Sequence, residues 1–455
     1  MKRLYIASLA IVAVLLAGAV LLPGQRTEIT GTINSGEKPT IAVADMHGSG
    51  AAGQYMDTFN KALWDELESS GQIKLAPKTS YPLQIPQQES DFKPPVMFSE
   101  WSRPPVSANY LGFGYTAVQD NQIVLFGNFF NVGQSTVQSA KVFSNRYYAA
   151  LSSDGAKSVA RQFAADILKQ LGIATLSGTK IYFVSDRTGG KASSGLPIKE
   201  IWSMDYDGSN QRQLTRYGSS SSQPAVSTDG KLFAFMTYAG GNPQIRIHTT
   251  DTSRRQTFLN PVSSVVATPE FTPDGKSVLF AATVDGWTQL LMAGIDGSGM
   301  HRLSNVNAIE VSPRVNPKTG HDLLFISGRS GHQQLWRMNL DGTDREMLTS
   351  GVGDVANPAW SPDGHHIAFS WTRGYEPGNL NIFVMDIADK VPVQLTSNSG
   401  RNENPWWAPD GVHLVFSSMR GRMTQIYSML ADGTSVRQLT TQGNNIQPVW
   451  AKGIE

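Results

Sequence analysis

The sequence predicts an α+β N-terminal domain followed by an all-β six-bladed β-propeller. Two observations lead to this prediction. A repeat with a period of about 45 residues fills the chain from about residue 180 onward, and the helical periodicity that is clear before that point disappears there. Each copy contains a short strand headed by a proline, and these prolines lie 43 to 47 residues apart, at Pro224, Pro269, Pro313, Pro358, Pro405 and Pro448.

The first residues have the layout of a secretory signal. Lys2 and Arg3 precede an apolar run over residues 4–22, and small residues at 17–19 offer a cleavage site. The run is also long enough to serve as a membrane anchor, so both alternatives stay open for 1–22. In either case we expect the rest of the chain to be exported. A lipid anchor is excluded because the chain has no cysteine.

Composition narrows the classes of function. The 38 Lys and Arg residues nearly balance the 37 Asp and Glu residues, and no Lys/Arg-rich run occurs. Phosphate backbones are bound by clustered basic charge, so we expect no nucleic-acid partner. The absence of cysteine also excludes disulfides, thiolate metal sites and a cysteine nucleophile.

The segment before the repeat combines strands and helices. Residues 40–46 and 73–77 are expected to be strands, and between them Met56, Phe59, Leu63 and Leu67 mark one face of an amphipathic helix. Seven prolines between positions 77 and 105 predict an irregular segment over the surface, held in place by apolar residues such as Trp101.

Three β-type runs follow, at 110–118, 123–130 and 136–143, and we expect them to form an antiparallel meander. A strong amphipathic helix is predicted over 154–171. We therefore divide the chain into a signal peptide or anchor (1–22), an N-terminal α+β domain (23–175) and a propeller (176–455).

Each repeat reads as four short strands, which is the content of one propeller blade. Asp-Gly pairs such as Asp207-Gly208 fit tight hairpin turns between strands. The first strand set, near Ile181, has no proline-headed strand before it, and the last proline-headed strand, at Pro448, has nothing after it. An open sheet edge at each end would be a liability, so we expect the C-terminal strand to complete the first blade and close the ring.

These motifs resemble the TolB family. Repeats of the form PAWSPDGHHIAFSW, with QLWRMNLDG and RQLT behind them, follow an exported α+β domain that begins IAVADMHGSGAAGQYMDTFNKALWDELESSGQIKL. The resemblance covers nearly the whole chain after residue 22. It implies a periplasmic component of the Tol-Pal envelope system that docks a Pal-type, peptidoglycan-associated lipoprotein. It further implies that the segment just after the signal, about 20–36, regulates partner binding, with a TolA-type inner-membrane protein as a second partner.

The residues argue against an enzyme and against a cofactor or metal. Propellers of this repeat type also cap serine peptidases, but no GxSxG nucleophile motif occurs in the sequence. His365 and His366 follow a Pro-Asp-Gly turn, where we expect exposed turn residues and no metal ligand. The residues around Asp205 lack the glutamate of a calcium loop. Trp360, Trp407 and Trp450 recur at one repeat position, so we expect them to pack between blades.

One set of residues remains as a candidate protein-binding site. The residue before each blade proline is polar, and an innermost propeller strand begins at the mouth of the central channel. We therefore expect these six side chains to form a ring: Gln223, Thr268, Ser312, Asn357, Asn404 and Gln447. Four charged residues are expected nearby: Glu310, Asp354, Arg401 and Glu403.

The ring has two interpretations. It could simply satisfy backbone groups at the strand starts, or it could form the docking face of a monomeric periplasmic interaction protein. The alternative function is a propeller that binds or processes a small molecule, such as a glycan, in its channel.

Overall fold

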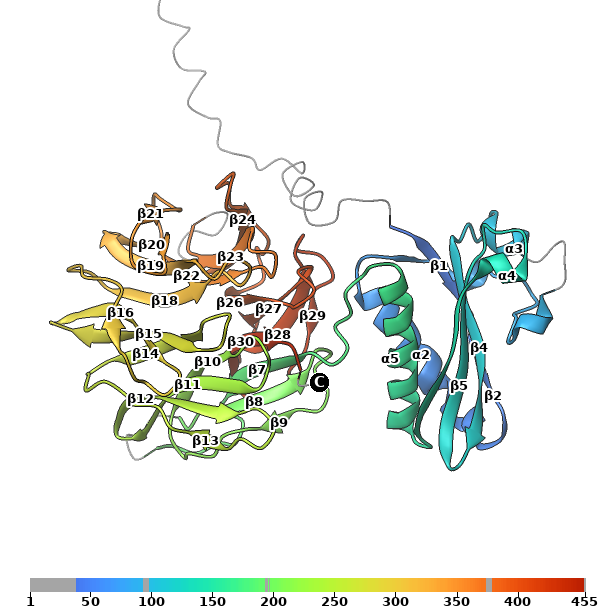
Figure 1. The fold of residues 1–455 in the computed structure, drawn as a ribbon, viewed down its shortest axis with the longest axis horizontal. Coiled ribbons are helices and arrows are strands. Elements are labelled where there is room, and N and C mark those ends of the chain that lie inside the picture. The colour runs from blue at the N-terminus through green and yellow to red at the C-terminus, as the bar shows by residue number, and fades with distance from the viewer. Residues whose placement is uncertain (1–37, 93–97, 193–194, 196, 374–378, 454–455) are drawn as a thin grey trace, which may run out of the picture.

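The computed structural model describes residues 38–92, 98–192, 195, 197–373 and 379–453. The expectations for 1–22 and for the regulatory segment at 20–36 fall outside these residues. The described chain forms a small α+β domain and a six-bladed β-propeller (Figure 1). No helix of the described ranges is long and apolar enough to span a membrane.

The N-terminal domain is built on one mixed sheet in the order β3-β1-β4-β5-β6, with β2 also paired to β4. Its strands are β1 (Thr40–Val43), β2 (His47–Gly48), β3 (Lys74–Leu75), β4 (Tyr110–Gln119), β5 (Gln122–Asn131) and β6 (Lys141–Ala150). Strands β4, β5 and β6 form the expected antiparallel meander. Strand β1 runs parallel to both of its neighbours, β3 and β4.

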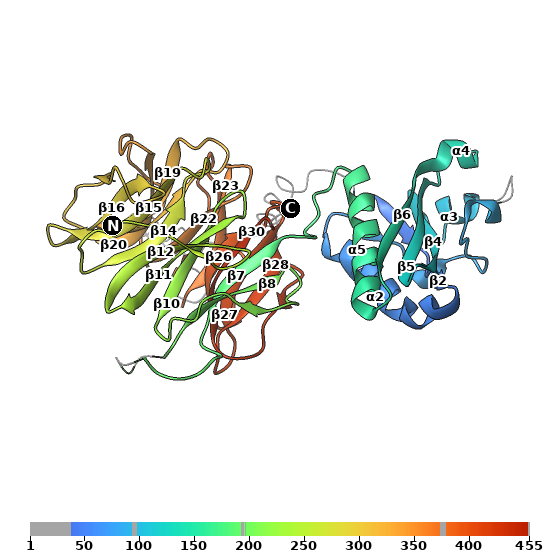
Figure 2. The same cartoon turned by 60° about the horizontal axis from the view of Figure 1, so that its bottom comes forward.

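Two helices, α2 (Met56–Ser69) and α5 (Ser153–Gln170), cover one face of this sheet (Figures 1 and 2). A short 3-10 helix, η1 (Gly50–Tyr55), leads into α2. The predicted apolar stripes are the buried faces, and Phe59 and Phe163 are fully buried between the helices and the sheet. Ser152 caps the N-terminus of α5, because its hydroxyl accepts a hydrogen bond from the Gly155 amide.

The proline-rich segment covers the opposite face of the sheet. Its described residues contain three short helical turns: η2 (Lys78–Ser80), η3 (Glu89–Asp91) and α3 (Ser99–Ser102). Trp101, Phe92 and Phe98 enter a second core with Phe113 and Phe130 of the sheet. Trp101 therefore holds the segment in place as the sequence predicts.

One local prediction was wrong. The run at 136–143 was expected to be a strand, but it begins with a single helical turn, α4 (Val137–Ala140). Thr136 and Ser139 exchange side-chain and backbone hydrogen bonds in a capping box that stabilises this turn. Strand β6 begins only at Lys141.

The propeller consists of six antiparallel four-stranded sheets. We number the blades 1 to 6 along the chain. The innermost strands, from blade 1 to blade 6, are β30 (Asn445–Ala451), β10 (Ser221–Val226), β14 (Val266–Phe271), β18 (Glu310–Val315), β22 (Val355–Trp360) and β26 (Arg401–Trp407). The second strands are β7 (Lys180–Ser185), β11 (Leu232–Gly240), β15 (Ser277–Val284), β19 (Asp322–Ser330), β23 (His366–Trp371) and β27 (His413–Met419).

The third strands are β8 (Glu200–Asp205), β12 (Asn242–Thr249), β16 (Trp287–Gly294), β20 (His332–Asn339), β24 (Asn381–Asp386) and β28 (Gln425–Leu430). The outermost strands are two residues long: β9 (Arg212–Gln213), β13 (Arg255–Gln256), β17 (His301–Arg302), β21 (Glu346–Met347), β25 (Val393–Gln394) and β29 (Arg437–Gln438). The third and fourth strands are joined by tight turns, and in blade 1 Gly208 supplies the positive φ of 87° that this turn needs.

Ring closure follows the sequence prediction. Strand β30 pairs with β7, so the C-terminal strand is the innermost strand of the first blade. Trp450 lies opposite Ile181 in this pairing, and its indole Nε1 donates to Thr179 Oγ1 at 2.9 Å. The two ends of the propeller are therefore fastened in one sheet.

The repeated tryptophans are buried as expected. Trp360, Trp407 and Trp450 are each less than a tenth exposed. The expectation for His366 was wrong, because this side chain is buried and only His365 is exposed. His366 begins β23, packs near the Trp407 ring and is hydrogen-bonded through Nδ1 to Asp363 at 3.2 Å.

Candidate protein-binding face

The two ends of the propeller can be told apart by the direction of the innermost strands. The innermost strand of each blade begins at the end of the propeller where the second strand finishes. We call this end the open face. We call the other end the domain face, because the turns there contact the N-terminal domain.

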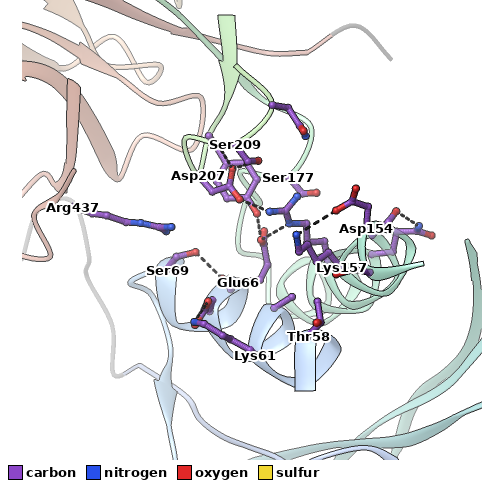
Figure 3. Close-up of a pocket in the computed structure, with 18 residues that line it drawn as sticks. Thr58, Lys61, Glu66, Ser69, Asp154, Lys157, Ser177, Asp207, Ser209 and Arg437 are labelled. Atoms are coloured by element: carbon purple, nitrogen blue, oxygen red, sulfur yellow. Dashed lines mark hydrogen bonds and ion pairs between the residues drawn. The ribbon is translucent and has the colours of Figure 1, made fainter. Parts of the chain in front are cut away.

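The domain contact is built around a buried carboxylate (Figure 3). Glu66 of α2 accepts a hydrogen bond from the Tyr206 hydroxyl of blade 1. Arg161 of α5 is paired with Asp207 in the neighbouring turn, and its Nε lies 3.9 Å from Glu66. Burial raises the pKa of Glu66 and that of Tyr206. These groups line an interdomain cavity of about 790 Å³ whose wall also includes Arg437.

Blade 6 adds a second contact. The imidazole Nε2 of His413 lies 2.7 Å from the Ser69 carbonyl at the end of α2, and Nδ1 lies 2.6 Å from Asp410. The backbone of Gly71 approaches the Leu430 side chain so closely that an added Cβ would lie 2.6 Å from it. The N-terminal domain thus sits against blades 1 and 6 on the domain face.

The six ring residues line a single cavity on the channel axis. Each occupies a bulge in its innermost strand and has a positive φ, between 49° and 56°. Three of the side chains accept a hydrogen bond from a backbone amide of the next blade. Gln447 Oε1 accepts from Gln223 N, Gln223 Oε1 accepts from Thr268 N, and Thr268 Oγ1 accepts from Ser312 N, at 2.8, 2.8 and 3.1 Å. These three side chains therefore satisfy backbone amides of the neighbouring innermost strands, as the first interpretation of the ring expects.

This series of hydrogen bonds between blades stops at blade 5. Asn404 is joined to Gln447 through Ser417, whose hydroxyl donates to Asn404 Oδ1 at 3.4 Å and accepts from Gln447 N at 3.0 Å. Among the described residues, the Asn357 amide has no hydrogen-bond partner. It lines the cavity, so its donor and acceptor remain available to a bound group.

A second tier of side chains follows the ring along the innermost strands. Arg314 of blade 4 donates to Glu270 of blade 3 at 3.1 Å, and its guanidinium lies 4.9 Å from the ring centre of Trp406 in blade 6. Blade 5 lies between blades 4 and 6, so the Arg314–Trp406 contact crosses the channel. Burial raises the pKa of Glu270 to about 7, although the Arg314 charge acts to lower it.

The ring, together with Arg314 and Trp406 of the second tier, lines a cup of only about 80 Å³. Ligand sites for drug-sized molecules have volumes of roughly 300–1,000 Å³. The cup has room for a few water molecules or for the tip of one side chain.

Sequence reasoning missed the second tier. Glu270, Arg314 and Trp406 each stand directly after a blade proline, where blades 2 and 5 have Ala225 and Ala359. Three large polar or aromatic residues among small ones at this repeat position were the available signal.

The four charged residues predicted near the ring do not line the cup. Glu310 is fully buried and paired with Arg329 at the start of β18. Asp354 is exposed and accepts from the Gln333 amide at 2.9 Å. Arg401 and Glu403 pair with each other at 3.1 Å. All four lie at or beside the strand starts of the open face.

No group of three or more His, Asp or Glu side chains within the described ranges is arranged to hold a metal ion. The fold and its site therefore define an α+β domain joined to a six-bladed propeller, with a shallow polar cup on the propeller's open face. The TolB β-propeller domain model matches residues 169–354 and 342–453, which is more than half of the chain. The chain belongs to this TolB family.

Individual relatives agree with this assignment. A TolB homolog from Chlorobium luteolum is 32% identical over 235 residues, 51% of this chain and 40% of that protein. The Tol-Pal system protein TolB of Desulfosudis oleivorans is 33% identical over 93 residues, 20% of this chain and 19% of that protein. The matches thus span less than half the length of these curated relatives. The crystal structure of TolB from Acinetobacter baumannii shares the fold with a TM-score of 0.73 at 20% identity, covering 91% of this chain and 97% of that one.

Proposed function

We propose that this protein is the periplasmic TolB component of a Tol-Pal envelope system. In this role it docks a Pal-type, peptidoglycan-associated lipoprotein on the open face of its propeller. It thereby supports outer-membrane integrity and constriction during cell division. The observation that carries the proposal is the shallow polar cup with its unpartnered Asn357 amide, on the face that the described part of the N-terminal domain leaves uncovered. A TolA-type inner-membrane protein is the second partner, reached through the segment near residues 20–36.

The volume of the cup favours protein docking over a channel ligand. A glycan needs a pocket several times larger than about 80 Å³, and the large side chains of Arg314 and Trp406 already occupy the wall of the cup. A side chain at the tip of a docked protein fits the cup, with the surrounding loops as the contact area. The small-molecule function is therefore the weaker candidate.

Binding of the soluble domain of the organism's Pal-type lipoprotein, measured by calorimetry, tests the proposal. The test variant replaces Asn357 and Asn404 with glycine, which tolerates their φ values of 53° and 55°. The partner's polar groups then lose their matching amides. A buried mismatch costs about 1–3 kcal/mol, so we expect at least tenfold weaker binding.

Asn210→Gly is the matched control, because Asn210 also has a positive φ (52°) but lies at the interdomain cavity. Unchanged affinity in the double variant would refute docking at the cup. Failure of the wild-type protein to bind the lipoprotein would refute the choice of partner.

A further inference from the structure

The open face is not uniform around the cup. Innermost strands contact one another in the ring order β10-β14-β18-β22-β26-β30, and β30 contacts β10 again. Blade 3 therefore lies opposite blade 6, with the cup between them. These two blades expose side chains of different chemistry.

Blade 6 exposes a group of arginines at the open face. Arg401 begins β26 and stands opposite Met419 at the end of β27, while Arg420 and Arg422 lie in the loop that follows. All three are exposed, and Arg401 is paired with Glu403. The three guanidinium groups thus have one carboxylate partner on their own blade. The described residues of this part of the face therefore carry a net positive charge.

Arg420 belongs to a repeated arrangement that is incomplete in blade 6. In blades 1 and 4, Arg187 and Arg329 stack over aromatic rings and bond through Nε to a serine two residues earlier. Each also reaches an acceptor side chain on the innermost strand, Asn445 and Glu310 respectively.

The guanidinium of Arg420 likewise lies 4.2 Å from the Tyr427 ring centre, and its Nε donates to Ser418. The corresponding residue of the innermost strand is Asn402. Its Oδ1 accepts instead from the Ser418 hydroxyl, at 2.7 Å. The terminal nitrogens of Arg420 therefore have no acceptor among the described residues, although stacking and the Nε bond hold the group in place. A guanidinium held in this way is suited to bind a carboxylate.

Blade 3 exposes apolar side chains at the same end of the propeller. Trp287 forms the tip of the β15–β16 hairpin opposite Val284 and is 42% exposed. Val265, directly before β14, accepts a backbone hydrogen bond from Thr283 on the same blade. Val262 is fully exposed in the preceding loop, and Ile309 follows on the blade 4 side.

This side of the face carries little free charge. Asp285, next to Trp287, is paired with Arg302 at 2.8 Å. Exposed apolar side chains that gather on one surface mark a contact site, and Trp and Arg are the residues that most often dominate binding energy.

We propose that the open face binds a protein partner in one fixed orientation, with the partner's carboxylate-bearing surface over blade 6 and an apolar surface over blade 3. The inference rests on docking at this face and specifies the chemistry of the partner. Charge complementarity identifies the acidic part, because excess guanidinium charge on one side favours carboxylates there. Blade 3 disfavours the acidic part of the partner. A carboxylate placed over Trp287 and Val262 would lose its hydrating water without gaining a hydrogen-bonding partner. The two sides together specify the orientation.

The test compares two pairs of variants in the same binding experiment, run at low and at high salt. Arg420→Gln with Arg422→Gln removes the unpaired charge from blade 6. We expect about tenfold weaker binding at low salt, and a smaller difference at high salt because ions screen exposed charges. Arg254→Gln with Arg255→Gln is the control, because these two exposed arginines lie at the outer β12–β13 turn of blade 2.

Trp287→Ala tests the apolar side. We expect roughly tenfold weaker binding that is the same at both salt concentrations, because the lost contact is not electrostatic. Met347→Ala is the control, an apolar residue of similar exposure (40%) on the outermost strand of blade 4.

The outcomes separate this inference from the proposed function. If the Asn357 and Asn404 glycine variant weakens binding but the arginine and Trp287 variants do not, docking at the cup stands and the fixed orientation is refuted. If the arginine pair weakens binding equally at both salt concentrations, the electrostatic role of blade 6 is refuted. If none of the variants alters binding, the open face is not the docking surface and both proposals fall.

Discussion

Replacing Glu270 with glutamine should change how the stability of the protein depends on pH. The pKa of this carboxyl is raised from 4.5 to about 7 by burial beneath the ring. The native state therefore holds a proton that the unfolded chain releases between these pH values, so wild-type stability falls as pH rises through this window. At 1.36 kcal/mol per pH unit the loss is about 3 kcal/mol. Below about pH 4.5 the carboxyl is protonated in both states and contributes no difference.

The assay is urea unfolding of the wild-type protein and of Glu270→Gln at a series of pH values from about 4 to about 8.5. Glutamine keeps an acceptor for Arg314 but does not titrate, and all other titrating groups are common to both proteins. We expect the wild-type stability minus the variant stability to decrease by about 3 kcal/mol across the series. Glu403→Gln is the control, because it removes a carboxylate from another innermost strand, at a less buried site.

Parallel pH profiles for the wild-type protein and Glu270→Gln would refute the reasoning. So would a wild-type protein that gains stability relative to the variant as pH rises. Either result would mean that the Arg314 charge outweighs burial and that the Glu270–Arg314 pair is fully ionised at neutral pH.

Three further predictions concern the framework of the propeller. Deleting 448–455 should raise hydrogen exchange over 181–214, because β7 loses its inner neighbour. Tyr206→Phe removes the hydroxyl that donates to the buried Glu66, so urea unfolding should show a loss of about 1–3 kcal/mol. Gly208→Ala should lower the melting temperature, since φ is 87° there and an added Cβ would lie 2.6 Å from a backbone oxygen of blade 6.

Each of these predictions can fail in a recognisable way. Increased exchange confined to 414–440 after the deletion would contradict closure through blade 1. Unchanged stability of Tyr206→Phe would mean that water satisfies Glu66. Gly178→Ala is the control for the glycine variant, because φ is 83° but no atom lies within 4 Å of the added Cβ. An equal fall in melting temperature in the two variants would show that backbone strain at positive φ, without the clash, accounts for the loss of stability.

The sequence was informative where the fold repeats. Proline spacing predicted the blades, and the missing strand before Ile181 predicted that the C-terminal strand would pair there, because each inference needed only the repeat unit. The ring of residues before the prolines was also found in this way. Helix α4 was missed because a capping box of two small polar residues overrides the β-type pattern around it.

Contacts between different repeats could not be predicted from the sequence. Glu270 and Arg314 are separated by one period, and Arg314 and Trp406 by two. Only the diameter of a six-bladed ring brings Arg314 and Trp406 together across the axis. The Glu66–Tyr206 contact likewise depends on how two domains pack, which no local periodicity encodes.

Closure by β30 also determines when the propeller can finish folding. Strand β7 and its inner neighbour β30 are far apart in the chain, and the indole of Trp450 bonds to Thr179 across a sequence separation of 271. Closing a loop of that length costs about 5 kcal/mol of chain entropy, so the joining of these strands is expected late. Until then one edge of blade 1 stays unpaired. The native propeller therefore depends on pairing between strands that are distant in the chain, a topology of high contact order that predicts slow folding.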